Sequence, residues 1–317
     1  MNEHFLSYIE IQQFKCFNNF KAEGFKRVNL IAGKNNIGKT AFMEAIFINI
    51  CSENIRSMIS ALIKVQANRE TLNLLDKNFS DVSLLNTINY YEASSNVCNT
   101  FFCIDQDGWK TDYVFEINGN EQVRINHNEI EFNLTFFSDI YFLDNFGLSN
   151  NQLNTAFQEV QKQDREQELN RFIQYFDSTI EAFKVIGEKP QCKVNGKYQD
   201  IVEFGDGLKH YISIIVTLYA CKEGYLFIDE IDNGIHYSQL DHLWELILNL
   251  SKQNNCQVFA ATHSKEMIES FERVVKKLDE QAISFTTLVK NNQQEIKTIT
   301  QNSEMLLYSI SQQHEVR

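Results

Sequence analysis

The sequence of 317 residues has a single proline, Pro190, and no apolar run long enough to cross a membrane. Because a membrane-spanning helix needs about 20 consecutive apolar residues, we expect no transmembrane segment and no membrane partner. The first residues, MNEHFLSYIEIQ, lack both the basic and the apolar stretch of a signal peptide. One proline against 25 phenylalanines favours an ordered chain with little linker. These absences predict a cytoplasmic protein.

An excess of basic residues is also absent, because the formal net charge is −13. This charge argues against a generally basic nucleic-acid-binding surface, although it is compatible with a local basic patch. The seven cysteines are scattered, with no Cys-x-x-Cys pair and no histidine at metal-ligand spacing. We therefore expect reduced, buried thiols rather than a disulfide framework or a zinc site.

The stretch GKNNIGKT fits the phosphate-loop pattern G-x-x-x-x-G-K-[ST] at every position. An apolar run at 28–32 predicts a buried strand before it, and residues 42–48 predict a helix after it. Glycines let backbone N–H groups curl around phosphate oxygens, and the helix N-terminus adds partial positive charge. Lys39 is expected to reach the β- and γ-phosphates of ATP, and Thr40 to ligate Mg²⁺. A chance match in a loop rich in glycine and asparagine is the alternative. The expected nucleotide-binding residues are Gly33, Lys34, Asn35, Asn36, Ile37, Gly38, Lys39, Thr40 and Ala41.

The middle of the chain changes character several times. Residues 52–98 begin with helical spacing and predict a helical insert. Residues 99–147 contain short strand-like pieces separated by turn signals, which predicts an antiparallel β-subdomain. Residues 148–178 are helical again, and the eight residues of 161–168 include no apolar side chain. We interpret 148–178 as an arm or lid, with a turn or an ordinary solvated helical face as the alternatives. Residues 180–203 are strand-like, with a hairpin turn at Asn195-Gly196.

Two further apolar strands end in polar residues that could bind Mg²⁺ or take part in hydrolysis. The run Tyr225-Leu226-Phe227-Ile228 is followed by Asp229 and Glu230, as in a buried parallel strand that delivers carboxylates at its carboxyl end. Asp229 is the expected partner of Thr40 on Mg²⁺. Glu230 could orient and deprotonate an attacking water. His263 ends the next strand, where it could hydrogen-bond a γ-phosphate or its water. An exposed acidic pair and a structural histidine are the alternatives.

Four motifs in order carry a resemblance to a known family. They are Asn35 within the phosphate loop, FGDGLKH around Gly205, LFIDEIDNGIH around Asp229 and QVFAATHS around His263. Together they resemble the ABC-type ATPases of the SMC, Rad50, RecF and OLD kind, and most of all the small bacterial AAA-family ATPases related to OLD nucleases. The resemblance covers roughly residues 1–50 and 180–317.

This resemblance implies an α/β fold, an ABC-ATPase head with a phosphate-loop parallel core sheet, an antiparallel β-subdomain and a helical insert or arm. Residues 1–317 would form one such head, with 1–50 and 180–317 as its nucleotide-binding core. The resemblance also implies that two heads sandwich two ATP molecules with Mg²⁺, so that the protein forms an ATP-dependent homodimer or higher oligomer.

The resemblance assigns further residues to the seam between the heads. Gly205, Asp206 and Gly207 would contact the γ-phosphate held by the other subunit, and Asp232-Asn233-Gly234 would lie at the seam. Glu203 stands where the family usually has a serine, so the contact would rest on backbone amides. The glutamine that usually senses Mg²⁺ has no clear equivalent, and Asn145 and Gln152 are guesses. Lys39, Glu230 and His263 are thus the expected catalytic residues.

Three functions follow from this resemblance. OLD nucleases carry a nuclease domain after the ATPase, whereas 54 residues follow His263 here, so we expect any nuclease to act in trans. The first hypothesis is an ATP-driven switch that triggers a co-encoded effector, such as a nuclease or toxin, in defence against phages. The second is a DNA-processing ATPase of the Rad50 and RecF kind, which the acidic charge disfavours. The third, a transporter's ATP-binding subunit, suits the long insert poorly.

Overall fold

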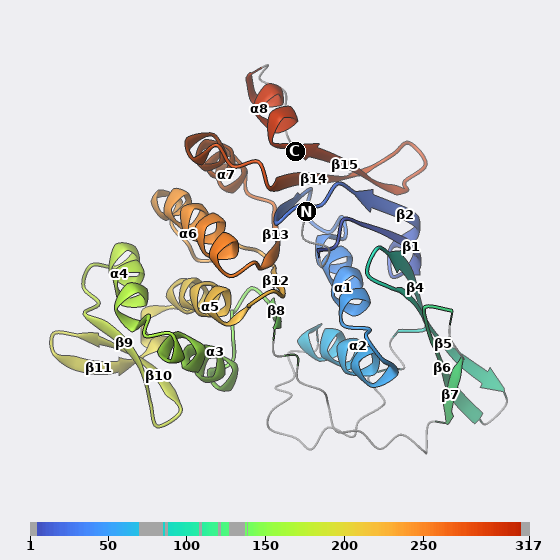
Figure 1. Ribbon diagram of the computed structural model, residues 1–317, viewed down its shortest axis with the longest axis horizontal. Coiled ribbons are helices and arrows are strands. Elements are labelled where there is room, and N and C mark those ends of the chain that lie inside the picture. The colour runs from blue at the N-terminus through green and yellow to red at the C-terminus, as the bar shows by residue number, and fades with distance from the viewer. Residues whose placement is uncertain are drawn as a thin grey trace. The chain divides into compact units, whose positions relative to one another are not determined.

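The computed structural model describes residues 5–69, 85, 88–107, 110–119, 122–126, 137 and 139–311 (Figure 1). The chain forms two compact units. The first contains Met1–Lys26, Ala32–Ser138 and Ser284–Gln301, and the second contains Arg27–Ile31, Asp139–Ile283 and Asn302–Arg317. Among the described residues, no helix has both the length and the apolar character needed to span a membrane.

The first unit is built on a six-stranded antiparallel sheet in the order β2-β1-β4-β5-β6-β7. Apolar side chains of β1, such as Ile9, Ile11 and Phe14, are buried between exposed polar ones, the pattern of a strand with one solvated face. The elements are β1 (Tyr8–Phe14), β2 (Phe17–Glu23), α1 (Lys39–Ile50), α2 (Ile55–Arg69), β4 (Tyr90–Ser95), β5 (Asn99–Asp107), β6 (Lys110–Ile117), β7 (Val123–Asn126), and most of β14 (Ile283–Lys290) and β15 (Ile296–Asn302).

Helix α1, which follows the phosphate loop, is buried at every position except Thr40. Its one acidic residue, Glu44, is therefore a buried carboxylate that needs partners. Lys15 Nζ lies 2.7 Å from Glu44 Oε2, and the Arg69 guanidinium contacts both carboxylate oxygens at 2.7 Å. These ion pairs join α1 to the turn between β1 and β2 and to the end of α2.

The structure corrects part of the expected division of the first half of the chain. Within the expected β-subdomain (99–147), β5, β6 and β7 do form an antiparallel meander. It continues through β4, a strand that lies inside the expected helical insert (52–98), to β1. Strand β8 (Ile140–Leu143), expected in this meander, instead pairs in parallel with β12 (Tyr225–Ile228). The buried Phe142 and Leu143 are successive strand residues and so lie on opposite faces of β8, which suits a parallel sheet better than a half-exposed meander. Of the expected helical insert, α2 is present and residues 70–84 lie outside the described part.

The second unit holds the parallel sheet and most of the helices. Strands β3, β13, β12 and β8 are neighbours in that order, and β12 is parallel to both β13 and β8. This confirms the expected parallel core. The elements are β3 (Val28–Ala32, of which Ala32 belongs to the first unit), β8, α3 (Asn150–Lys162), α4 (Glu166–Phe176), β9 (Ala182–Ile186), β10 (Lys189–Val194), β11 (Lys197–Asp200), the 3₁₀ helix η3 (Ile201–Phe204), α5 (Asp206–Ala220), β12, the 3₁₀ helix η4 (Tyr237–Gln239), α6 (Leu240–Gln253), β13 (Gln257–Thr262), α7 (Lys265–Leu278) and α8 (Ser303–Ser311).

Residues 148–178 form two packed helices rather than a projecting arm. Helix α3 buries Leu153, Phe157 and Val160 and packs along α5. The apolar-free stretch contains the turn between α3 and α4, where Asp164 adopts a left-handed conformation (φ 54°). Gln163 fastens this turn by donating a hydrogen bond to the Tyr219 carbonyl oxygen of α5. The turn that the sequence left as an alternative is therefore the observed structure.

A small antiparallel sheet, β11-β10-β9, precedes α5. The expected hairpin turn lies between β10 and β11, where Val194 pairs with Lys197. Both turn residues, Asn195 (φ 50°) and Gly196 (φ 75°), are left-handed, as a two-residue hairpin of this type requires.

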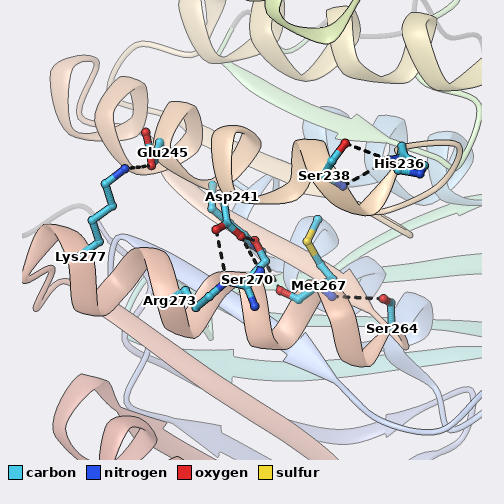
Figure 2. Close-up of polar contacts among 10 residues, drawn as sticks. His236, Ser238, Asp241, Glu245, Ser264, Met267, Ser270, Arg273 and Lys277 are labelled. Atoms are coloured by element: carbon cyan, nitrogen blue, oxygen red, sulfur yellow. Dashed lines mark hydrogen bonds and ion pairs between the residues drawn. The ribbon is translucent and has the colours of Figure 1, made fainter.

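Helices α6 and α7 lie side by side in the second unit, and ion pairs join their outer faces (Figures 1 and 2). Arg273 binds Asp241 through two nitrogens, and Lys277 pairs with Glu245. Such exposed pairs contribute little stability, typically about 0–1 kcal/mol. The fully buried Trp244 matters more: its ring packs on Phe271 at 4.6 Å between centroids, and its indole N–H donates to the Met267 carbonyl.

We expect Trp244→Ala to lower the free energy of unfolding by about 3–5 kcal/mol, because it leaves a large cavity between α6 and α7. Trp244→Phe, which keeps most of the ring but loses the hydrogen bond, should cost about 1 kcal/mol. Urea titrations followed by circular dichroism measure both changes. Tyr237→Ala, at a side chain that is 69% exposed, serves as the control. Equal unfolding midpoints for Trp244→Ala and the control would contradict the packing role.

Candidate functional site

The phosphate loop closes onto the N-terminus of α1 in the first unit. Gly38 is the N-cap, with φ 108°, and a Cβ there would lie 2.8 Å from the Cys16 Sγ. Lys39 folds back over the loop and donates hydrogen bonds from Nζ to the carbonyl oxygens of Gly33 (3.0 Å) and Lys34 (3.2 Å). Since Gly38 has no side chain to accept from them, the first N–H groups of α1 suit an anion. This half of the predicted site therefore has the form that a phosphate group requires.

The acidic pair lies at the carboxyl end of β12 in the second unit. The N–H of Asp229 donates to Leu143 O of β8, and the N–H of Glu230 donates to Asp229 Oδ1. Glu230 adopts a left-handed backbone (φ 45°), which is uncommon for a residue with a side chain. Asn233 N closes the turn by donating to Glu230 O at 2.8 Å. The chain thus turns sharply at Glu230, directly after the strand.

His263 directly follows β13, the parallel neighbour of β12. Its side chain is exposed. The next residue, Ser264, caps α7 by accepting a hydrogen bond from the Met267 N–H at 3.2 Å (Figure 2). Because Ile228 pairs with Ala260, Glu230 and His263 leave the same edge of the parallel sheet.

The segments around Gly207 and Gly234 touch through their backbones. A Cβ on Gly207 would overlap the Gly234 carbonyl oxygen, and a Cβ on Gly234 (φ 68°) would lie 2.7 Å from the Gly207 Cα. Gly205 (φ 85°) is the N-cap of α5, so the amides of this helix start directly at the motif. The exposed Glu203 precedes it in η3. Only glycines allow this approach, a pairing that the sequence did not predict.

The end of β8 adds an acidic residue that the sequence analysis missed. Leu143 pairs with Ile228, so Asp144 follows its strand as Asp229 follows β12. Burial raises the pKa of the Asp144 carboxyl. The signal was present, since IYFLD repeats the pattern of YLFID.

Asn145 and Gln152, the two guesses for a Mg²⁺-sensing residue, make different contacts in the structure. The carbonyl oxygen of Asn145 accepts a hydrogen bond from Asn233 Nδ2 at 2.6 Å, which ties it to the turn after β12. Gln152 instead forms a capping box with Ser149 at the start of α3. Asn145 therefore keeps the better position, and Gln152 has a structural role that accounts for it.

A second missed residue is His210, one turn into α5. It is fully buried, and among the described residues neither ring nitrogen has a hydrogen-bond partner. Burial lowers the pKa of His210 to about 4, so the imidazole is neutral at physiological pH. Its backbone lies against Gly147, in the loop after β8.

The predicted residues therefore fall into two groups, one in each unit. The phosphate loop lies in the first unit, whereas the motifs at Gly205, Asp229 and His263 lie in the second. The latter three are joined through the turn at Glu230–Gly234. A hollow of about 520 Å³ also occurs in the second unit, between α4, η4, α6 and α7, but none of the predicted residues lines it.

Comparison with known proteins shows what this chain is similar to. Residues 112–268 match the family model described as AAA ATPase domain, a stretch that begins after the phosphate loop and includes the other three motifs. An ATP/GTP phosphatase of Helicobacter pylori is 25% identical over 333 aligned positions, which cover 86% of this chain and 88% of that protein. The chain is an ATPase that is similar to the AAA ATPase domain family over residues 112–268.

Solved structures support the fold of this ATPase. An SMC head bound to the C-terminal winged-helix domain of ScpA is similar with a TM-score of 0.56 and 14% identity, covering 95% of this chain and 99% of that one. An SMC head with an extended coiled coil, bound to the C-terminal domain of ScpA derived from Pyrococcus furiosus, has a TM-score of 0.53, 13% identity and coverage of 97% and 99%. The expected ABC-ATPase head fold is thereby confirmed.

We expect Gly207→Ala to reduce ATP turnover by at least about tenfold, because the methyl group would push the start of α5 away from Gly234. Phosphate release measured well below the unfolding transition reports the change. Gly224→Ala is the matched control, since its Cβ would overlap the Asp139 carbonyl oxygen outside the three motifs. It should lower the melting temperature similarly but keep its turnover. Equal turnover in the two variants would show that the Gly207 contact has no role in hydrolysis.

Proposed function

We propose that the phosphate loop of the first unit and the motif residues of the second unit both serve ATP hydrolysis. The phosphate loop binds the triphosphate through its amides and through Lys39, which exchanges the carbonyls of Gly33 and Lys34 for phosphate oxygens. Glu230, held at the sharp turn after β12, accepts the proton of the attacking water. His263 hydrogen-bonds the γ-phosphate or that water. The observation that carries this proposal is the strand register, by which the backbone segments of Glu230 and His263 leave the same edge of the parallel sheet.

The residues present also suit Mg²⁺. Thr40 provides a hydroxyl, and Asp229 provides a carboxylate, both oxygen ligands of the kind that Mg²⁺ prefers. The remaining ligands would be phosphate oxygens and water. When bound, the ion would neutralise charge on the phosphates.

We further propose that the active form is a dimer. Gly205, Asp206 and Gly207 present the amides at the start of α5, and the touching Asp232–Gly234 turn lies beside them. Just before this motif, the side chain of Val202 in η3 is 65% exposed and adds apolar surface to the protein. A second copy could cover this surface and place its own nucleotide against the amides. Glu203 would not donate to that phosphate, so the backbone would supply the contact.

The proposed role of this dimer is to switch a separately encoded effector, such as a nuclease or toxin, in defence against phages. The resemblance to small OLD-related ATPases supports this role, and so does the net charge of −13, which opposes binding to DNA phosphates. The expected division into a nucleotide-binding core (1–50 and 180–317) with inserted segments belongs to the same proposal.

Replacing the proposed base tests the hydrolytic site. We expect Glu230→Gln to keep ATP affinity while turnover falls by about 10²–10⁴-fold, the range for loss of a general base. Because ATP then persists, the dimer should accumulate in light scattering with ATP and disperse with ADP. Undiminished phosphate release would remove Glu230 as the base.

Recovery of the partner tests the biological role. In a pull-down with ATP, tagged Glu230→Gln protein should retain the protein encoded beside it. Lys39→Ala, which we expect not to bind ATP, should retain less of that protein. Duplex DNA is the competing partner, and its binding would weaken steeply between 50 and 200 mM salt. Tight ATP-dependent DNA binding with such a salt dependence, and no protein partner, would favour the Rad50-like function instead.

A further inference from the structure

Thr262, the last residue of β13, is fully buried and makes two side-chain hydrogen bonds. Its hydroxyl donates to Asp232 Oδ1. The Thr262 hydroxyl oxygen also accepts a hydrogen bond from the backbone N–H of Ser264 at 3.0 Å. The Thr262 hydroxyl therefore links the two residues that flank His263, because it belongs to Thr262 and binds the backbone of Ser264.

Asp232 lies in the turn that carries Glu230. That turn is closed by the hydrogen bond from Asn233 N to Glu230 O. The hydrogen bond from Ile231 N to Ala261 O attaches its backbone to β13. The Thr262–Asp232 bond is thus a side-chain link between the backbone that carries His263 and the backbone that carries Glu230. It is independent of the sheet pairing of β12 with β13, which ends at Ile228 and Ala260.

The same turn reaches the other motif segments. Asn233 Nδ2 binds the Asn145 carbonyl after β8, and Gly234 touches Gly207 at the start of α5. A displacement of the N-terminus of α5 would therefore move the turn. Through Asp232 and Thr262 it would also move the segment that carries His263.

We propose that Thr262 is a positioning residue for ATP hydrolysis, which fixes His263 relative to Glu230 through its hydrogen bond to Asp232. This inference rests on the proposed function, in which Glu230 and His263 act on the same phosphate and water. In this proposal Thr262 itself contacts neither the phosphate nor the water. Its hydroxyl is needed because both partners, a carboxylate oxygen and a backbone N–H, would otherwise lose a hydrogen bond in a partly buried place.

Thr262→Val tests the hydroxyl with nearly unchanged side-chain volume. We expect kcat to fall by about tenfold or more, since small misplacements of catalytic groups reduce rates strongly. The dissociation constant for ATP should change by less than about threefold, because the phosphate loop is untouched. Thr262→Ser, which restores the hydroxyl, should recover kcat to within about threefold of the wild type.

A double-mutant cycle with Asp232→Ala identifies the partner. If the two side chains act through their mutual bond, Thr262→Val combined with Asp232→Ala should be scarcely slower than the slower single variant. Multiplied losses in the double variant would overturn the pairing.

Thr217→Val is the matched control. Its hydroxyl is also fully buried, but it donates only to backbone carbonyls of α5, Ser213 and Ile214. We expect its kcat to equal that of the wild type. If Thr217→Val and Thr262→Val lose the same activity, the effect is general destabilisation and the proposal fails.

Glu230→Gln, measured in parallel, separates the two proposals. If Glu230→Gln is inactive and Thr262→Val is fully active, the positioning role fails while the hydrolytic site stands. If Glu230→Gln hydrolyses ATP normally, the proposed site itself fails, and the positioning inference falls with it.

Discussion

The parallel pairing of β12 with β13 determines where the chemistry of the second unit can occur. Four residue pairs, from Tyr225 and Gln257 to Ile228 and Ala260, fix the register. Both strands are completely buried, so a shift would cost many contacts. With this register, the residues that follow the strands, Glu230 and His263, leave from one edge, which is where ligands bind in parallel sheets.

Polar contacts then refine what the sheet places. The turn after β12 is closed by the backbone bond from Asn233 N to Glu230 O. Asn145 and Thr262 hydrogen-bond to it, and the Gly207 backbone lies against Gly234. These contacts restrain its conformation. The left-handed backbone at Glu230 is compatible with this restraint, because strained conformations persist where the surroundings over-determine them.

The acidic character of the chain is consistent with this organisation. The buried Glu44 carboxylate is paired with Lys15 and Arg69. The only part of the predicted site that needs fixed positive charge is the phosphate loop. There Lys39 and the α1 amides provide it without a broad basic surface. An ATPase can therefore carry a net charge of −13, whereas a protein that grips DNA along its surface would need local compensation.

Local sequence patterns were sufficient for the phosphate loop, for β12 with its acidic pair, for α5 and for the hairpin at Asn195-Gly196, because each depends on residues that are neighbours in the chain. They were not sufficient for β8, whose apolar residues fit a meander and a parallel core equally well until its partner is known. The contacts of Gly207 with Gly234 and of Thr262 with Asp232 join residues 27 and 30 positions apart. Periodicity records burial along one element but not which elements meet, so only tertiary packing decided these contacts.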